Sequence, residues 1–274
     1  MPLNARRMIR KMRGGAQAHL LECDDDNFYV VKFINNPQGR RILINEWIGA
    51  ALLRQLGLTT PPTAIVRTSD EFLEANPEAF LERGSSTVRP HSSWHFGSQY
   101  PANPYRTLVW DLLPDGAAEE TANASDLLGV LAFDKWTSNA DGRQSIFYRA
   151  RVQDGLNVRP AFVTSMIDNG FLFQGPEWTF RDAPAQGLYY SLRVYRGVRG
   201  LEHFEPWLSR IESFPASAID AAIKAMPSVW FQDNAERDEL DRMMERLLLR
   251  RSRVRDLIVQ VRELAQNPFP NWRG

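Results

Sequence analysis

Two short acidic motifs carry most of the structural information in this chain: Asn139-Ala140-Asp141-Gly142-Arg143-Gln144 and Ile167-Asp168-Asn169-Gly170. The segments between them, Ser145 to Tyr148 and Arg159 to Ile167, have the composition of a β-hairpin. Asn, Asp and Gly are also the ordinary residues of tight turns, and Asp-Asn-Gly is a strong hairpin-turn pattern. In isolation the two motifs therefore favour plain turns, and the case for a functional site depends on residues elsewhere.

The order of the two motifs has a chemical parallel. In phosphotransferases of the protein-kinase type, one Asp positions the acceptor hydroxyl, and a second Asp, about two or three dozen residues later in an apolar-Asp-x-Gly turn, holds the magnesium ion. The chain contains this order and spacing once, with Asp141 first and Asp168 second. The order indicates a phosphotransferase if the other parts of such an enzyme are also present.

A lysine within an apolar strand provides one of those parts. The run Phe28 to Phe33 predicts a β-strand that contains Lys32, although only four of the 33 Lys and Arg residues are Lys. Such a lysine is costly unless it is paired or faces solvent, and a kinase needs one to reach the phosphates while a helical Glu holds it. Glu46 lies in the segment Arg41 to Leu56, whose apolar residues have helical spacing. The alternative is an edge-strand Lys beside an unrelated surface Glu.

A glycine-containing turn precedes this strand, in the segment Arg13 to Leu21. Glycine lets the backbone approach phosphate oxygens closely, so a nucleotide-covering loop is expected here. The residues of this candidate loop are Gly14, Gly15, Ala16 and Gln17. The segment matches neither a Walker A loop nor G-x-G-x-x-G, and a Gly-Gly hairpin turn without a ligand is the alternative.

Together these residues resemble the HipA-like serine/threonine kinases, in particular a short branch of HipA-like kinase domain proteins. The resemblance rests on Gly15-Ala16-Gln17, Val31-Lys32, Phe133-Asp134-Lys135-Trp136 leading into Asn139-Ala140-Asp141, and Ile167-Asp168-Asn169-Gly170. It covers most of the chain, from about Arg10 to the last helix.

The resemblance implies an α+β, two-lobed protein-kinase-like fold with a small β-rich N-terminal lobe and a mainly helical C-terminal lobe. It also implies ATP and Mg²⁺ as cofactors, Asp141 as the catalytic aspartate and Asp168 as a magnesium ligand. Lys32, paired to Glu46, would lie on the α- and β-phosphates.

The segment Tyr105 to Leu113 predicts a strand. In a kinase it would be the connector between the lobes, whose backbone N–H and C=O groups bind the adenine edge. Val109 and Asp111 are the residues expected at that edge.

Some residues depart from the family's pattern. The catalytic loop of the family ends in an Asn that binds a second metal ion, and Ile146 occupies that position here, while Arg143 occupies the position of a His. Ile cannot bind magnesium, so Gln144 or a water replaces the missing ligand, or the protein holds one metal, or its activity is low. A nucleotide-binding pseudokinase or scaffold is therefore the alternative function, and transfer of AMP instead of phosphate stays open. The segment Met8 to His19 contains no Ser or Thr, so phosphorylation cannot control this loop.

The expected division of the chain is an N-terminal lobe, 1–113, with an irregular insertion at 84–105, and a C-terminal lobe, 114–274. A helix is predicted from Asp126 to Trp136, and a helical pattern runs from about Asn234 to Gln266. Between them, Gly175 to Gly200 occupies the position of an activation segment. Four tryptophans of the C-terminal half are expected to pack in the core rather than form a ligand cage: Trp178, Trp207, Trp230 and Trp272.

Composition limits the remaining possibilities. The 274 residues have a formal net charge of zero, which gives no support to nucleic-acid or membrane-surface binding. Four arginines of the last helix are expected to form a solvated basic face: Arg250, Arg251, Arg253 and Arg255. The single Cys23 excludes an internal disulfide and is expected to be buried or half-buried.

The chain shows no apolar run of membrane-spanning length and no signal peptide, so a cytoplasmic protein is expected. His91 and His95 stand four residues apart but in a segment that does not look helical, which argues against a zinc pair. The acceptor, a protein or a small molecule with a hydroxyl group, is not identified by the sequence.

Overall fold

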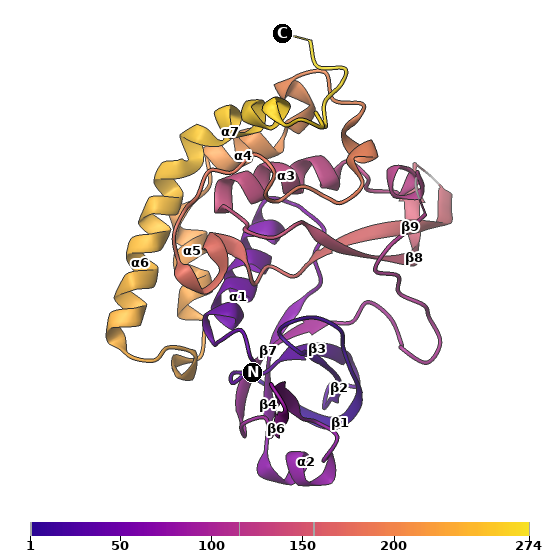
Figure 1. The fold of residues 1–274 in the computed structure, drawn as a ribbon. Helices are drawn as coiled ribbons and strands as arrows, with labels where there is room; N and C mark the ends of the chain where they lie inside the picture. The colour runs from indigo at the N-terminus through magenta and orange to yellow at the C-terminus, as the bar shows by residue number, and fades with distance from the viewer. Residues whose placement is uncertain (1, 115, 156, 274) are drawn as a thin grey trace.

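The computed structural model describes residues 2–114, 116–155 and 157–273. Figure 1 shows a β-rich N-terminal part below a mainly helical C-terminal part, with the β8–β9 hairpin at one side of the helical part. The predicted α+β class is confirmed. No helix within the described residues is long and apolar enough to cross a membrane.

Five strands of the N-terminal part form a closed barrel in the order β1-β2-β3-β7-β4. These strands are β1 (Leu3–Lys11), β2 (His19–Cys23), β3 (Phe28–Lys32), β4 (Thr63–Thr68) and β7 (Ser93–Gln99). The parallel pairing of β1 with β4 closes the barrel, and every other pair is antiparallel. The predicted strand around Lys32 is confirmed as β3, and the predicted burial of Cys23 is also confirmed.

Strand β7 corrects the prediction that 84–105 is an irregular insertion. It pairs with both β3 and β4 and is therefore a central strand of the barrel. Its Ser, His and Gly residues obscure the strand pattern in the sequence, but Gly97 and His95 each have a structural reason. Gly97 is needed because an added Cβ would lie 2.7 Å from Val66 Cγ2. His95 is fully buried, where its Nδ1 accepts a hydrogen bond from the Ile34 N–H at 3.0 Å and its Nε2 lies 2.8 Å from Thr68 Oγ1. A small hairpin, β5 (Leu81–Arg83) and β6 (Ser86–Val88), precedes β7.

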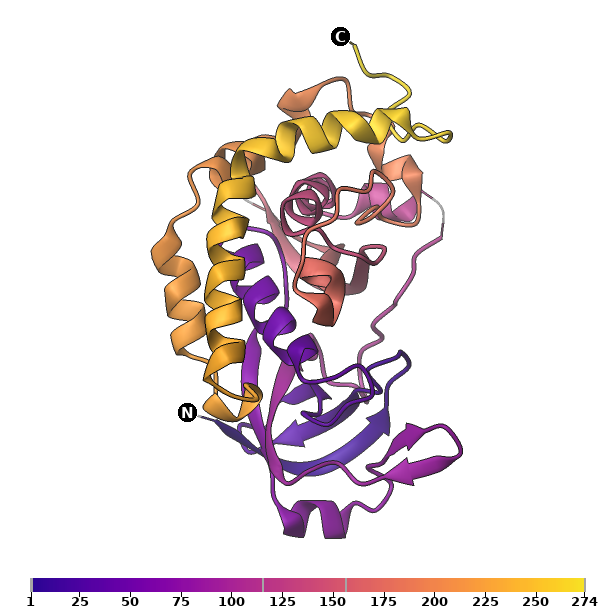
Figure 2. The ribbon, with the colours of Figure 1, turned by 60° about the vertical axis from the view of Figure 1, so that its left-hand side comes forward.

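Helix α1 (Arg41–Gln55) confirms the predicted helix and joins the two parts of the molecule. It follows the barrel strand β3 in sequence, yet it packs beside α5 (Ala216–Lys224) of the helical part (Figures 1 and 2). Ten of the 15 residues of α1 are buried, so the helix is covered on most of its sides. Glu46, one of these ten, is therefore held in the interior between the two parts.

The remaining helices belong mostly to the C-terminal part. The α-helices are α2 (Asp70–Ala75), α3 (Asp126–Thr137), α4 (Trp207–Glu212), α6 (Asn234–Leu249) and α7 (Val254–Gln260). The 3₁₀ helices are η1 (Ala117–Glu120), η2 (Leu172–Glu177), η3 (Leu192–Tyr195), η4 (Leu201–Phe204), η5 (Ser228–Trp230), η6 (Arg250–Arg253) and η7 (Val261–Glu263). The predicted helix after Asp126 is confirmed as α3.

The predicted hairpin is confirmed and is longer than expected: β8 spans Gln144–Asp154 and β9 spans Asn157–Ile167. The predicted strand from Tyr105 to Leu113 is wrong. Only Trp110 forms a bridge there, with Phe147 of β8. The rest of the segment is an irregular connector that begins in a turn at Tyr105 and Arg106 and bends at Asp111. Its Leu108 and Leu112 are exposed.

The long C-terminal helical pattern is interrupted at η6, where the chain turns from α6 into α7 (Figure 2). The arginines at this bend correct the prediction of a solvated basic face only in part, because Arg253 keeps an exposed side chain. Arg250 is buried and donates to the carbonyl oxygens of Lys135 and Trp136, both at 3.0 Å. Arg251 donates to Phe214 O, and Arg253 and Arg255 form ion pairs with acidic side chains. The predicted packing of the tryptophans is confirmed, since Trp178, Trp207 and Trp230 are buried and Trp272 packs against the core.

Candidate active site

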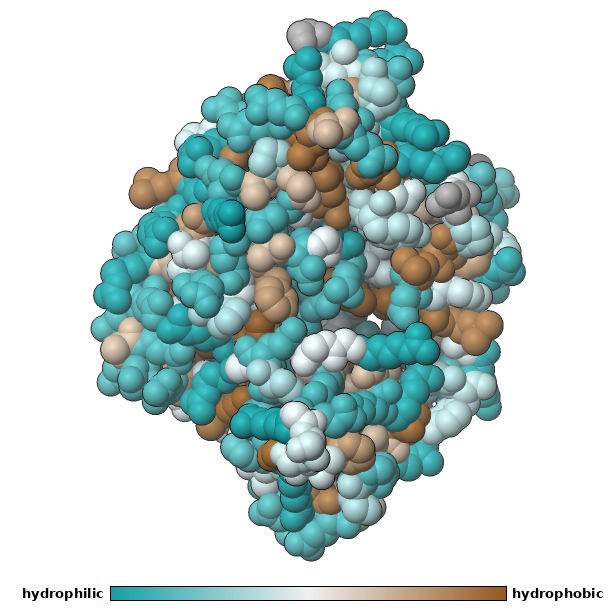
Figure 3. Space-filling model, in the orientation of Figure 1, coloured by the Kyte–Doolittle hydropathy of each residue, from teal (hydrophilic) through white to brown (hydrophobic). Residues whose placement is uncertain are grey.

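A cavity of about 550 Å³ lies between the barrel and the β8–β9 hairpin. Its walls come from β1, β3, α1, β7, the connector, β8 and β9. The space-filling view shows the surface hollowed at the junction of the two parts (Figure 3). A cleft of this size that mixes apolar walls with a few charged side chains is typical of a small-molecule site.

Three charged side chains meet inside this cavity: Lys32, Glu46 and Asp168. Lys32 Nζ donates to Glu46 Oε1 and, at 2.7 Å, to Asp168 Oδ1. Glu46 Oε2 accepts a hydrogen bond from the Asn169 backbone N–H at 3.0 Å. The side chains of Lys32 and Glu46 are only 12% and 3% exposed, whereas Asp168 is 30% exposed and open to the cavity. Residues that are 136 positions apart in sequence thus form one ion-pair cluster.

The electrostatics of the cluster keep Lys32 and Asp168 charged. Burial alone would lower the pKa of the Lys32 ammonium, but the carboxylates of Glu46 and Asp168 outweigh it and raise the pKa. Burial alone would raise the pKa of the Asp168 carboxyl, but the Lys32 ammonium holds that pKa below its usual range. For Glu46, burial is the larger influence and raises the pKa of its carboxyl against the pull of Lys32.

The backbone around Asp168 fixes its carboxylate in place. Asp168 has a left-handed backbone conformation with a φ of 60°, and the turn packs directly on α1. At Gly170 an added Cβ would lie 2.8 Å from Ile42 Cγ2. At Gly49 an added Cβ would lie 2.6 Å from Asn169 Cβ. Glycine at both positions therefore lets the Asp168 turn approach the helix that carries Glu46.

The acidic loop, residues 138–143, lies next to this turn. Asn139 accepts a hydrogen bond from the Asp141 backbone N–H at 3.2 Å, and Asp141 Oδ1 accepts one from the Gly142 N–H at 3.0 Å. The Asp141 carboxylate is exposed, and Asp141 is not among the residues that line the cavity. The loop thus presents an exposed carboxylate, and hydrogen bonds within the loop contribute to the order of its backbone.

A buried ion pair joins the acidic loop to the Asp168 turn, and the sequence reasoning missed it. The guanidinium of Arg143 binds both carboxylate oxygens of Asp134, and both side chains are fully buried. Another nitrogen of Arg143 donates to Ile167 O at 2.9 Å and to Asn169 Oδ1 at 3.0 Å. The sequence contained a signal for this pair. Arg143 occupies the position of the family's His, and it follows by nine residues Asp134, which lies in a buried helix.

Strand β8 places Gln144 and Ile146 on the cavity wall. Residues two apart in a strand share one face, so these two side chains are neighbours along the wall. Gln144 is exposed, while Ile146 is only 8% exposed. The position expected to supply a second metal ligand therefore carries a hydrocarbon side chain at the cavity surface. On the same face of the strand, the neighbouring residue Gln144 carries a side-chain amide oxygen.

The connector supplies backbone groups to the cavity. Trp110 exchanges both of its backbone hydrogen bonds with Phe147, at 2.9 and 2.8 Å. In a trans peptide the C=O of one residue and the N–H of the next point in opposite directions. Because the N–H and C=O of Trp110 face Phe147, the C=O of Val109 and the N–H of Asp111 point away from β8, and both residues line the cavity. This arrangement suits the hydrogen-bonding edge of a planar heterocycle.

The glycine loop contributes less to the cavity than the sequence predicts. Gly14, with a φ of 117°, lines it, whereas Gly15, Ala16 and Gln17 are not among its lining residues. The Gln17 side chain instead forms two hydrogen bonds with the backbone of Glu82, at 2.9 and 2.7 Å. This contact ties the loop to the β5–β6 hairpin.

Three further cations line the cavity near this loop and were not predicted: Arg10, Lys11 and Arg13. Lys11 pairs with Glu82, and Arg10 stacks on the ring of Tyr100. Together with Lys32 they make this end of the cavity suitable for a polyanion.

The donor set of the cavity also suits a hard cation. Magnesium usually binds one or two protein oxygens together with substrate phosphates, and Asp168 and Gln144 both offer oxygen atoms here. No group of three or more His, Cys, Asp or Glu side chains in the described part of the chain could hold a metal alone. A metal at Asp168 and Gln144 would complete its coordination with water or with oxygens of a bound substrate.

Comparison with solved structures reveals the fold. Two structures of the Golgi casein kinase, the second with Mn/ADP bound, match with TM-scores of 0.56 and 0.54 at 12% and 11% identity. These matches cover 96% and 95% of this chain and 74% and 72% of theirs. The Helicobacter pylori proinflammatory kinase CtkA matches with a TM-score of 0.54 at 12% identity over 97% of this chain and all of its own. The predicted protein-kinase-like fold is confirmed.

Comparison of sequences gives the family. No curated protein matches the chain. A family model described as HipA-like kinase matches residues 6–148, which is more than half of the chain and includes Lys32, Glu46 and Asp141. The chain belongs to the HipA-like kinase family.

Proposed function

We propose that this protein is an ATP- and Mg²⁺-dependent kinase that transfers the γ-phosphoryl group of ATP to a hydroxyl group of a protein Ser/Thr or of a small molecule. The observation that carries the proposal is the cluster of Lys32, Glu46 and Asp168 inside a cavity of about 550 Å³. A structural ion pair alone would not require a partly exposed carboxylate beside an open cavity.

Each residue of the cluster has a role in this proposal. Lys32 binds the α- and β-phosphates while Glu46 holds its ammonium in position, and the backbone of Val109 and Asp111 binds the adenine edge. Gly14 covers the phosphates from the barrel side. Asp168 and Gln144 would supply the protein oxygens that hold Mg²⁺, and the bound ion would neutralise charge on the phosphate oxygens.

The phosphoryl transfer itself needs one protein group near the acceptor. The acceptor oxygen forms a bond to the γ-phosphorus, the bond from that phosphorus to the bridging oxygen breaks, and ADP leaves. Asp141 orients the acceptor hydroxyl and takes its proton. Its exposed carboxylate, outside the nucleotide cavity, is accessible to an acceptor that approaches from solvent.

One observation favours a second candidate function, a nucleotide-binding pseudokinase or scaffold. Ile146 places a hydrocarbon at the cavity wall where the family has a metal-binding Asn. A protein with this change can retain the nucleotide site and lack efficient transfer.

Two variants separate the enzyme from the scaffold. Asp141→Asn should lower turnover by about 10²- to 10⁴-fold and leave ATP binding nearly intact, because a general base acts in the transition state. Asp168→Asn should weaken both, because a metal ligand also supports the bound nucleotide. Turnover is measured with labelled ATP, Mg²⁺ or Mn²⁺ and cell extract, and binding is measured as the rise in melting temperature with ATP and Mg²⁺.

The outcomes have distinct meanings. Activity that survives Asp141→Asn unchanged would show that the role of Asp141 is wrong. ATP binding without transfer by the parent chain to any acceptor favours the scaffold, and no thermal shift at millimolar ATP argues against the nucleotide site itself.

A further inference from the structure

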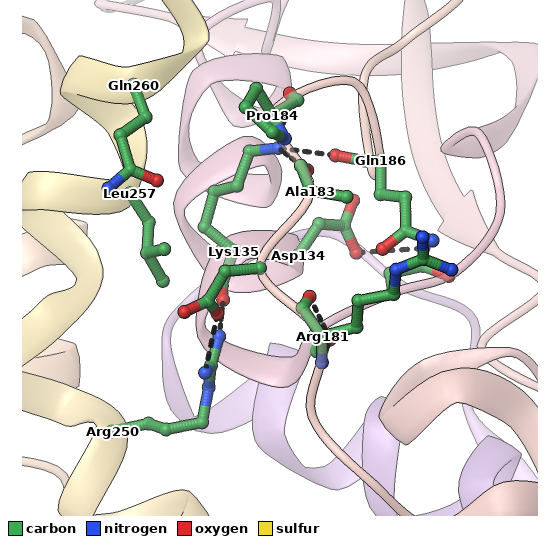
Figure 4. Close-up of a pocket in the computed structure, with 12 residues that line it drawn as sticks. Asp134, Lys135, Arg181, Ala183, Pro184, Gln186, Arg250, Leu257 and Gln260 are labelled. Atoms are coloured by element: carbon green, nitrogen blue, oxygen red, sulfur yellow. Dashed lines mark hydrogen bonds and ion pairs between the residues drawn. The ribbon is translucent and has the colours of Figure 1, made fainter.

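A second buried lysine, Lys135 of α3, has a different kind of partner. Its ammonium donates to three backbone carbonyl oxygens, those of Ala183 at 3.3 Å, Pro184 at 2.8 Å and Gln186 at 2.6 Å. Figure 4 shows the lysine reaching between these residues. An ammonium has three N–H donors, so all of them are used. Lys135 is 5% exposed, so its ammonium depends on these carbonyl oxygens for its hydrogen bonds.

The carbonyls belong to a segment that we call the strap, residues 181–188. The strap has two further anchors on the helical part. The hydroxyl of Ser138 binds both the N–H and the C=O of Arg181, at 2.9 and 2.8 Å. The carboxylate of Asp182 pairs with Arg250 at 2.8 Å and with Arg253 at 2.7 Å. The strap is therefore fixed along its first half by side chains from α3, the acidic loop and η6.

The second half of the strap holds the acidic loop. The Gly187 N–H donates to Asp141 O at 3.0 Å, and the Arg143 N–H donates to Leu188 O at 3.0 Å. Gly187 has a φ of 75°, and an added Cβ would lie 2.4 Å from Asp134 Cβ, so the strap packs directly on the buried Asp134–Arg143 pair. Displacement of the strap would remove two backbone hydrogen bonds from the loop that carries Asp141.

The space around Lys135 argues against a ligand site. The pocket at this cluster has a volume of about 10 Å³, which is room for roughly one water molecule. A substrate or cofactor cannot reach the lysine without opening the strap. The cluster is therefore built to hold a segment of the chain, not a small molecule.

We propose that Lys135 is a positioning residue that, by clamping the strap, holds the backbone of the acidic loop in the geometry that Asp141 needs. The importance of this geometry for turnover rests on the proposed kinase function, whereas the mechanical link from Lys135 to the loop does not. In many kinases a phosphorylated loop is ordered by new contacts with Arg residues. Here Asp182 with Arg250 and Arg253, together with Lys135, provides the ordering contacts without a phosphate.

The test compares Lys135→Met with Lys224→Met, a matched change at an exposed lysine at the end of α5. Hydrogen exchange of the Gly187 and Arg143 amides reports the link directly, because these amides form the two hydrogen bonds between strap and loop. Lys135→Met should accelerate both exchanges by about tenfold or more, and Lys224→Met should leave them unchanged. Turnover should fall by about 10- to 100-fold in Lys135→Met only, with the ATP-induced thermal shift retained.

Two additional variants keep the test decisive if Lys135→Met folds poorly. Lys135→Arg retains donors for the carbonyls and should recover part of the lost protection. Asp182→Asn weakens the other anchor of the strap and should act in the same direction with a smaller effect. Unchanged exchange of the Gly187 and Arg143 amides in Lys135→Met would overturn the proposal, as would normal turnover when their protection is lost. A parent chain that shows no phosphoryl transfer would count against the proposed function, and the exchange result would still decide whether Lys135 positions the loop.

Discussion

Lys32, which is partly buried, and Lys135, which is buried, have opposite kinds of partner for their ammonium groups. Lys32 pairs with two carboxylates, which raise the pKa of its ammonium despite burial. Lys135 binds three neutral carbonyls, and burial lowers the pKa of its ammonium to about 8, with Asp134 and Asp182 only partly offsetting the effect. A lysine held by anions beside a cavity can exchange partners with a ligand. A lysine held by backbone carbonyls in a closed cluster can only fix the chain.

The largest expected difference between the two lysines follows from removing each side chain. Lys32→Met leaves Glu46 and Asp168 close together in a buried site without their cation, and breaking such a pair costs about 3–5 kcal/mol. Lys135→Met leaves three neutral carbonyls and no unpaired charge, so its loss of unfolding free energy should be clearly smaller. Urea unfolding of both variants at neutral pH measures this difference.

The nucleotide response should separate the same two variants. Lys32→Met should also lose the ATP-induced thermal shift, and Lys135→Met should keep it. Equal destabilisation by the two changes, or an ATP response that depends on Lys135 and not on Lys32, would contradict the different roles assigned to the two lysines.

The pH dependence of stability should differ in sign between the two lysines. In the range from about 8 to 10.5, the unfolded chain keeps the proton on Lys135 while the folded chain has lost it. Because the unfolded state then binds more protons, the free energy of unfolding rises with pH across this range, by at most about 3 kcal/mol. The raised pKa of Lys32 gives no gain in this range, and its contribution is lost only at higher pH, as the ammonium deprotonates in the folded state.

The difference in unfolding free energy between the parent chain and Lys135→Met, measured from pH 7.5 to 10.5, isolates the Lys135 contribution. Lys224→Met serves as the control for an exposed lysine. A difference that stays flat or falls with rising pH would show that the Lys135 ammonium is not destabilised by its burial.

The same contrast explains how much of the site the sequence predicts. Lys32 is visible because a charge in an apolar strand is unusual, and its partners Glu46 and Asp168 lie in recognisable helix and turn patterns. The two-lobed fold follows from the order of these parts. Lys135 has no comparable pattern, since its partners are backbone atoms, and any residue provides a carbonyl.

Other failures of the prediction have the same physical origin. Strand β7 is hard to predict because His95 and Gly97 are required by tertiary contacts and do not have high strand propensity. The arginines of η6 look like a solvated face because acceptors such as Asp182 and the carbonyl of Trp136 are distant in sequence. Local patterns reveal elements and charged pairs, whereas interactions with distant backbone atoms become visible only in the fold.

The smallest expected effect concerns Ile146. A change at this residue tests whether the cavity that contains Lys32 lacks a metal ligand that phosphoryl transfer needs. Ile146→Asn adds an amide oxygen to the cavity wall on the same face of β8 as Gln144, and it restores the ligand type that the family has there. If the chain is a weakened kinase, we expect turnover or the apparent affinity for Mg²⁺ to rise by up to about tenfold. Ile146→Leu, which keeps the wall apolar, should show no gain. A Mg²⁺ titration of phosphoryl transfer for the three proteins measures the effect.

If Ile146→Asn gains nothing while Asp168→Asn abolishes activity, Asp168 supplies the metal binding that this site needs, and the apolar wall at Ile146 belongs to a working one-metal enzyme.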